Sequence, residues 1–97
     1  MEVVWSATAR RDRDEIHAFI ARTRTPTHAH DWLSRINRAI DDIVSYPLWS
    51  RVIDEAGNRD RVVAGPRPCY IVRYRYQPRA QRIRIVGIFH GAQQRSS

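Results

Sequence analysis

Arginines that alternate along two neighbouring stretches are the side chains best suited to chemistry in this sequence. Arg73 and Arg75 lie two apart in YIVRYRY, and Arg82 and Arg84 lie two apart in RIRIVGIFH. An arginine guanidinium stays protonated at ordinary pH and can donate two hydrogen bonds to a carboxylate or a phosphate. These four side chains can therefore bind an anion or stabilise charge at a phosphate, but none of them can act as a general base.

One histidine lies close enough in sequence to supply proton transfer. His90 ends the second arginine stretch, and the other three histidines lie at position 30 or before. RNA cleavage by 2′-hydroxyl attack needs a base, charge stabilisation at the phosphate and a proton for the leaving oxygen. His90 with Arg73 and Arg82 is therefore one hypothesis for a catalytic set. The alternative is that His90 closes its strand and the arginines form a solvated face.

Other kinds of chemical site have little support in the sequence. His28 and His30 would point about 200° apart on a helix, and no third ligand is in register, so we expect no metal site and no cofactor. The serines, aspartates and histidines show no nucleophile-elbow pattern. Tyr70, Tyr74 and Tyr76 could stack nucleic-acid bases. They share a strand face with an apolar neighbour, however, which favours a place in the core.

The arginine pairs belong to a stretch, 61–90, that is predicted to form three strands. Turn-like clusters at 65–68 and 77–81 divide it into runs rich in Val, Ile, Tyr and Phe, which is typical of an antiparallel meander. Residues 58–97 hold nine arginines and one acid, whereas residues 1–57 hold eight arginines and nine acids. The formal net charge of +7 thus lies in the sheet-forming half. This imbalance indicates an acidic partner, either nucleic acid or protein.

Alternation along these runs sorts the side chains between two faces. In the run 70–76, we predict that the tyrosine face packs on the core and that the face with Arg73 and Arg75 turns to a partner. In the last run, alternation places these residues on one face: Arg82, Arg84, Val86, Ile88 and His90. The opposite face then carries Ile83, Ile85, Gly87 and Phe89.

The residues before the meander predict a short strand at 3–5 and two amphipathic helices. The first helix is expected over about 8–22. The second is capped by Thr25, starts at Pro26, and ends before Pro47 because the residue before proline resists the α region. The order β-α-α-β-β-β predicts an α+β fold, with an N-terminal strand, a helical hairpin and a three-stranded antiparallel meander. The first strand can pair inside the sheet, because the chain returns to the sheet by way of the two helices.

Length and composition indicate one domain over residues 1–97. A hydrophobic share of 42% and a charged share of 28% fit a soluble globular protein. No apolar run approaches the roughly 18 residues that span a bilayer, and no signal peptide is recognisable. We therefore expect no membrane partner and a cytoplasmic location. The lone Cys69 cannot form an internal disulfide, which agrees with that compartment.

The order of these elements and their local patterns resemble the ParE/RelE superfamily of bacterial toxins from toxin–antitoxin modules. The matching pieces are VVWSATARRDRDEIHAFI, INRAIDDIVSYP, and YIVRYRY followed by RIRIVGIFHGAQQ. The resemblance covers nearly the whole chain and implies a small twisted antiparallel sheet with an N-terminal helical hairpin. It also implies a type II toxin in a hetero-oligomer with a cognate antitoxin, whose C-terminal segment wraps the toxin and holds it inactive.

Two activities occur in this superfamily. RelE-like members cut messenger RNA on the ribosome with basic residues on the sheet, whereas ParE-like members are associated with blocking DNA gyrase. At positions where the nucleases tend to carry basic residues, this chain has Ile71 and, after His90, Gly91-Ala92-Gln93. The resemblance to the ParE branch implies DNA gyrase as the target, bound without catalysis. The alternatives are a RelE-like ribosome-dependent mRNA endonuclease and an inactive relative that only binds an antitoxin.

A cationic sheet with an exposed edge suits an acidic, partly disordered antitoxin segment, which adds a strand or lays a helix across the sheet. Arginine forks would pair with its carboxylates. The candidate residues for binding the antitoxin or the target are six arginines: Arg59, Arg61, Arg73, Arg75, Arg82 and Arg84. The alternative is that these arginines only keep the protein soluble.

Overall fold

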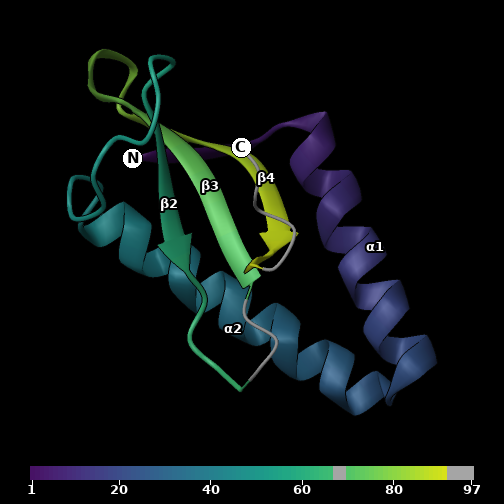
Figure 1. The fold of residues 1–97 in the computed structure, drawn as a ribbon. Coiled ribbons are helices and arrows are strands. Elements are labelled where there is room, and N and C mark those ends of the chain that lie inside the picture. The colour runs from purple at the N-terminus through teal and green to yellow at the C-terminus, as the bar shows by residue number, and fades with distance from the viewer. Residues whose placement is uncertain (67–69, 92–97) are drawn as a thin grey trace.

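The computed structural model describes residues 1–66 and 70–91 and confirms the predicted order of elements (Figure 1). The elements are β1 (Glu2–Trp5), α1 (Ala7–Thr23), α2 (Pro26–Ser45), β2 (Asn58–Val62), β3 (Tyr70–Gln77), a short 3-10 helix η1 (Pro78–Ala80) and β4 (Arg82–His90). The predictions on Arg67 and Pro68 in the first turn, on Cys69, and on Ala92 and Gln93 lie outside the described residues. The α+β class is as predicted.

Both helices begin at a side-chain cap. The Ser6 hydroxyl accepts a hydrogen bond from the Ala9 N–H at 3.0 Å, and the Thr25 hydroxyl accepts one from the His28 N–H at 3.0 Å. Each cap satisfies an N–H group that has no partner inside the helix. Pro26 holds the first position of α2, where its missing N–H costs nothing. The predicted start of the second helix is therefore confirmed.

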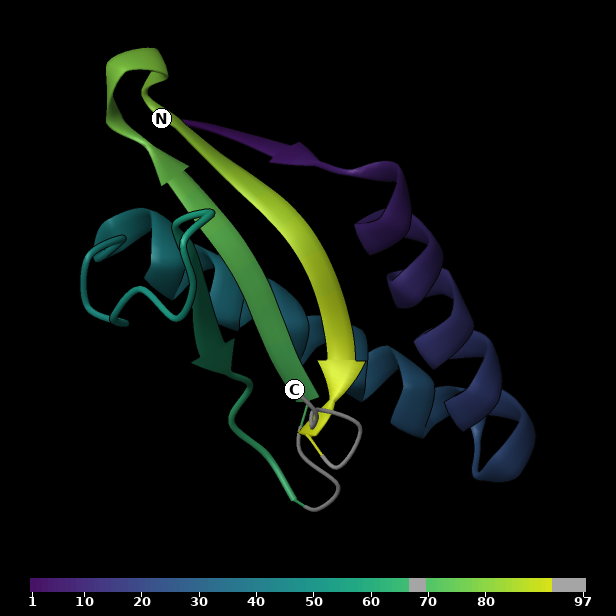
Figure 2. The ribbon, with the colours of Figure 1, turned by 45° about the horizontal axis from the view of Figure 1, so that its top comes forward.

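The four strands form one sheet in the order β1-β4-β3-β2. Strands β2, β3 and β4 are antiparallel, which confirms the predicted meander, and β1 runs parallel to β4. β1 therefore lies at an edge of the sheet, beside β4 (Figure 2), and does not take the inner place that the sequence allowed. The reason is that the helical hairpin carries the chain past the whole sheet to β2 at the far edge, and the meander then returns to β1.

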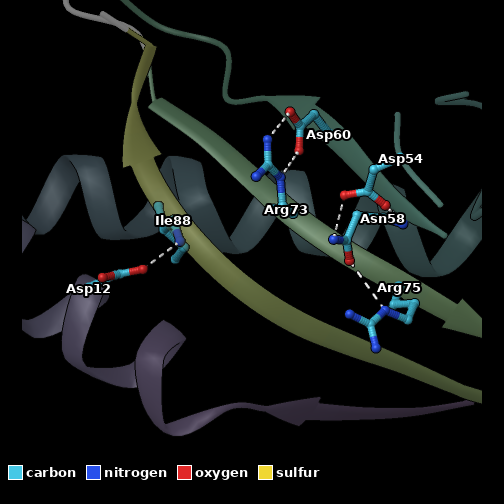
Figure 3. A network of polar contacts seen from close by, with 7 residues as sticks. All are labelled: Asp12, Asp54, Asn58, Asp60, Arg73, Arg75 and Ile88. Atoms are coloured by element: carbon cyan, nitrogen blue, oxygen red, sulfur yellow. Dashed lines mark hydrogen bonds and ion pairs between the residues drawn. The ribbon is translucent and has the colours of Figure 1, made fainter. Parts of the chain in front are cut away.

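Helix α2 lies across one face of the sheet, which we call the helix face (Figures 1 and 2). Helix α2 crosses behind β2 and β3, while α1 stands alongside β4. The buried core between them is mainly isoleucine, valine and aromatic, for example Ile36 and Ile43 of α2 against Val72, Tyr74 and Ile85 of the sheet. The opposite face carries Arg73 and Arg75 (Figure 3) and is covered by neither helix; we call it the open face. Arg84 belongs to the same face, because it lies opposite Arg75.

An extra residue in β4 changes which side chains share a face. Ile85 lies opposite Tyr74 on β3, but the next pair joins Gly87 to Arg73, so Val86 has no partner of its own. This irregularity is a β-bulge, in which two residues of one strand oppose one residue of the other. Because side chains alternate with a period of two, one inserted residue moves every later side chain to the face opposite the predicted one.

The bulge overturns the predicted facing of the last residues of β4. Ile88 lies opposite Val72 and His90 lies opposite Tyr70, so both point to the helix face. Phe89 instead joins the open face. The prediction that Ile88 and His90 share a face with Arg82 and Arg84 is therefore wrong.

Helix α1 satisfies the part of the β4 edge that β1 does not reach. Strand β1 pairs only with residues 82–85. Beyond them, the Ser6 hydroxyl donates to the Val86 carbonyl at 2.9 Å, and the Asp12 carboxylate accepts the Ile88 N–H at 2.9 Å (Figure 3). A Cβ at Gly87 would lie 3.2 Å from that carboxylate, so glycine permits the approach. These contacts occupy edge groups that would otherwise be free to pair with another strand.

We expect Asp12→Ala to lower the free energy of unfolding by about 1–2 kcal/mol, because the half-buried Ile88 N–H loses its acceptor. Asp14→Ala is the matched control in the same helix. Its carboxylate is 74% exposed and meets only Arg13, at 3.5 Å, so we expect a change within about 0.5 kcal/mol. Urea unfolding of the two variants measures the difference. Equal losses would contradict a role for Asp12 at the strand edge.

Candidate functional site

The fold separates the six predicted arginines into two groups. Arg59 lies opposite Tyr74 and Arg61 lies opposite Val72, so both belong to the helix face. The other four share the open face: Arg73, Arg75, Arg82 and Arg84. The predicted antitoxin or target set is thus brought together only in part.

Arg59 and Arg61 fasten the segment that follows α2 to strand β2. The Arg59 guanidinium donates a hydrogen bond to the Ser50 carbonyl. Arg61 contacts the Asp42 carboxylate at 3.2 Å, and its guanidinium lies 5.1 Å from the centre of the Trp49 ring. Both side chains therefore already have partners within the chain.

Arg73 is engaged by a carboxylate on the open face. Its guanidinium donates two hydrogen bonds to Asp60, at 2.8 and 3.0 Å (Figure 3), and lies 4.8 Å from the centre of the Phe89 ring. The hydrogen bonds to Asp60 raise the pKa of Arg73. A bidentate pair of this kind uses two guanidinium N–H donors that an incoming carboxylate would need. Asp60 is the one acid in residues 58–97, and this isolation is the sequence signal that could have identified it.

Arg75 is held by a single hydrogen bond that starts a short polar network. Its Nε donates to the Asn58 side chain at 3.2 Å. Asn58 in turn donates from its side-chain amide to Asp54 at 2.8 Å and from its backbone N–H at 3.0 Å (Figure 3). Both hydrogen bonds lower the pKa of Asp54, and the one from the Asn58 side chain has the larger effect. Within the described residues, the two terminal nitrogens of Arg75 have no partner.

Arg84 and Arg82 complete the open face. Arg84 is exposed and has no hydrogen bond or ion pair among residues 1–66 and 70–91. It lies directly opposite Arg75, and like charges at opposite positions of a sheet are unfavourable. Arg82 pairs with Glu2 at 3.1 Å, but both side chains are well exposed, so water screens the pair. An anion placed between Arg75 and Arg84 would relieve their repulsion.

His90 lies on the other side of the sheet from these arginines. Its ring stands edge-on to Tyr70, with 5.6 Å between the ring centres. It lines a cavity of about 410 Å³ between α1 and the end of β4, whose wall includes Asp12 and Glu15. No described lining residue of this cavity is an arginine, and its two carboxylates oppose the approach of a phosphate.

The hypothetical catalytic set is therefore not brought together by the fold. Arg73 is on the open face, and Arg82 is at the far end of β4, opposite Gln77.

The predicted tyrosine face is confirmed, since Tyr70 and Tyr74 are 4% and 1% exposed in the core. No group of three His, Cys, Asp or Glu side chains in the described part of the chain is arranged as metal ligands would be. Neither α1 nor α2 is long and apolar enough to cross a membrane.

One comparison with known proteins identifies a family, and another identifies a shared fold. A family model described as the ParE toxin of the type II toxin–antitoxin system, parDE, matches residues 3–95. The chain is also similar to a solved structure titled "Chromosomal ParDE TA system from P. aeruginosa", with a TM-score of 0.73 and 19% sequence identity, covering 93% of this chain and 95% of that chain. This likeness shows a shared fold. A search of curated protein sequences finds no match.

Proposed function

The chain belongs to the ParE toxin family of type II toxin–antitoxin systems, and from this premise we propose that it stops bacterial growth by binding DNA gyrase. A cognate antitoxin neutralises it. The observation that carries the proposal is the family match, which spans residues 3–95 and so nearly the whole chain. Action on gyrase would place the protein in the cytoplasm.

The position of His90 supports action by binding and not by RNA cleavage. General acid–base cleavage needs the proton carrier and the charge-stabilising groups at one phosphate. His90 shares its cavity with Asp12 and Glu15, whereas Arg73 and Arg84 point to the open face. Among the described residues that line this cavity, an RNA backbone would meet two carboxylates beside the histidine and no arginine. The endonuclease alternative therefore gains no support from this geometry.

The open face supports a defined site for the antitoxin. Arg73 already pairs with the Asp60 carboxylate through two hydrogen bonds, so the arginines more available to an acidic segment are Arg75, Arg82 and Arg84. A carboxylate between Arg75 and Arg84 would form charge-assisted hydrogen bonds and remove a like-charge contact. We propose that the acidic C-terminal segment of the antitoxin lies across β3 and β4 at this pair.

Induced expression and a gyrase assay test the function. We expect the purified toxin to inhibit supercoiling by gyrase, and an equimolar amount of antitoxin to restore it. In cells, replication should halt and a DNA-damage response should follow while bulk messenger RNA stays intact. Early loss of messenger RNA with intact supercoiling would reject the gyrase proposal in favour of the endonuclease alternative. Normal growth would reject a toxic function.

Exchange of His90 separates binding from catalysis. We expect His90→Gln to remain toxic, with His30→Gln as the control, because His30 is exposed on α2 and far from the sheet in sequence. Loss of toxicity in His90→Gln alone, with antitoxin binding retained, would contradict action by binding.

A further inference from the structure

Two guanidinium groups on the open face lie across from each other with unused hydrogen-bond donors. Arg75 of β3 lies directly opposite Arg84 of β4, and we call these two residues the facing arginines. Directly opposed residues of an antiparallel pair have Cβ atoms about 4.5–5.5 Å apart, so two long side chains can reach one ligand between them. Among the described residues, Arg84 has no hydrogen bond or ion pair, and the terminal nitrogens of Arg75 have none. Donors for an anion are therefore available on both sides of one point.

The other two arginines of the open face are each balanced by a carboxylate. Arg73 donates two hydrogen bonds to Asp60, at 2.8 and 3.0 Å. Arg82 pairs with Glu2 at 3.1 Å. In the part of the chain that the structure describes, no carboxylate contacts the facing arginines. The positive charge of this face that has no direct counter-charge is therefore that of the facing arginines.

A buried amide fixes the direction of the Arg75 guanidinium. Asn58 is 9% exposed, and its side-chain oxygen accepts from the Arg75 Nε at 3.2 Å (Figure 3). Each oxygen of Asp54 accepts a hydrogen bond from Asn58, one from its side-chain nitrogen and one from its backbone N–H. Because the amide nitrogen can only donate, these bonds fix which end of Asn58 meets Arg75. Arg75 is thus held by its Nε, and both terminal nitrogens stay available in an ordered side chain, which loses little conformational entropy on binding.

We propose that the facing arginines form a site for one inorganic phosphate dianion in the free toxin. Two guanidinium charges are balanced by the two charges of the dianion, whereas a carboxylate or a nucleic-acid phosphodiester supplies only one. Guanidinium N–H groups match the spacing of phosphate oxygens and form charge-assisted hydrogen bonds with them. Binding also relieves the like-charge contact between the two strands. Asn58 is a positioning residue of the site, because it acts on the phosphate only through Arg75.

The phosphate site coincides with the place proposed above for the antitoxin, and this step alone rests on the proposed function. A phosphate between the facing arginines occupies the N–H donors that an antitoxin carboxylate would use. Phosphate and antitoxin therefore compete, and phosphate lowers the apparent affinity of the toxin for its antitoxin. Neutralisation of the toxin then depends on the phosphate concentration and not on ionic strength alone.

Calorimetric titration of the purified toxin with inorganic phosphate tests the site, at about pH 8 so that the dianion predominates, and with ionic strength held constant by sodium chloride. We expect one site with a dissociation constant on the order of 1 mM, since a few charge-assisted hydrogen bonds form at an exposed position. Acetate and dimethyl phosphate carry one charge each and should bind about tenfold more weakly or less. At about 10 mM phosphate, the apparent affinity for the antitoxin should fall by about tenfold.

Variants locate the site on the open face. Arg84→Gln removes one guanidinium and should weaken phosphate binding by about tenfold. Asn58→Ala keeps every charge but frees Arg75, so the loss should be smaller, about three- to fivefold. Arg79→Gln is the matched control, because Arg79 is exposed in η1, outside the open face, and its loss should leave phosphate affinity within about twofold. Circular dichroism checks that each variant is folded at the temperature of the titration.

The outcomes separate the phosphate site from the proposed function. Unchanged phosphate affinity in Arg84→Gln would overturn the site, as would an equal loss in Arg79→Gln or equal affinities for phosphate and acetate. Unchanged affinity in Asn58→Ala would remove its positioning role, and if that variant fails to fold, the exposed Arg84→Gln still decides the site. Phosphate binding that leaves antitoxin affinity unchanged would support the site and reject the proposed antitoxin position. Inhibition of gyrase by a toxin that binds no phosphate would reject the inference and leave the proposed function standing.

Discussion

Reversing the charge of Arg84 is expected to weaken antitoxin binding while making the toxin itself more stable. Arg84 is exposed and lies directly opposite Arg75. Arg84→Glu turns a repulsive cross-strand pair into an attractive one, which should raise the free energy of unfolding by about 0.2–1 kcal/mol. The new carboxylate would also repel the acidic antitoxin segment that we propose to bind at this pair. We expect a fall in affinity of roughly ten- to a hundredfold, or about 1.4–2.8 kcal/mol.

The opposite signs of these two effects make the test specific. Arg79→Glu is the matched control, because Arg79 is exposed in η1, outside the open face, and the change in charge is the same. Calorimetric titration with the antitoxin and urea unfolding are measured for both variants. An equal loss of affinity in Arg79→Glu would mean that the antitoxin responds only to net charge. Unchanged affinity in Arg84→Glu would reject the proposed site.

Truncation of Tyr74 is expected to give the largest loss of stability in the sheet. Tyr74 is 1% exposed at the centre of β3, and its hydroxyl donates to the Pro47 carbonyl at 2.8 Å. Tyr74→Ala removes a large buried ring and leaves that carbonyl without its donor, so we expect a loss of about 3–5 kcal/mol. The free energy of unfolding of a small domain is only about 5–15 kcal/mol, so this variant would lose much of its stability.

Two further variants divide this loss into its parts. Tyr74→Phe keeps the ring and removes only the hydrogen bond, which should cost about 1 kcal/mol. Tyr76→Ala lies on the same face of the same strand, but Tyr76 is only half-buried, so its loss should be clearly smaller. Urea and thermal unfolding give the three values. A loss in Tyr76→Ala equal to that in Tyr74→Ala would contradict the central position of Tyr74.

The sequence predicts well those features that depend on neighbouring residues. The helix start at Thr25 and Pro26 follows from cap chemistry within one turn. The alternation in β3 correctly assigns Tyr70 and Tyr74 to the core, because a regular strand needs no information beyond its own period. The order of the elements and the antiparallel meander follow in the same way.

The features that the sequence did not predict depend on residues far apart in the chain. Nothing in the local pattern of β4 marks Val86 as an extra residue, since only its pairing with β3 reveals the bulge. The bond between Arg73 and Asp60 likewise depends on the register of two strands. Sequence alone therefore counted Arg73 as free and assigned His90 to the wrong face. These two errors concern the residues that decide between catalysis and binding.

The pairing of β1 with β4 also affects how the chain folds. Glu2 pairs with Arg82, and the Ser6 hydroxyl bonds a carbonyl that lies 80 residues later. Closing so long a loop costs more chain entropy than closing the local hairpins of the meander, and sheets with distant partners fold slowly. On the ribosome, β1 must wait unpaired until β4 has been made. The strand that is synthesised first is thus among the last to pair in the sheet.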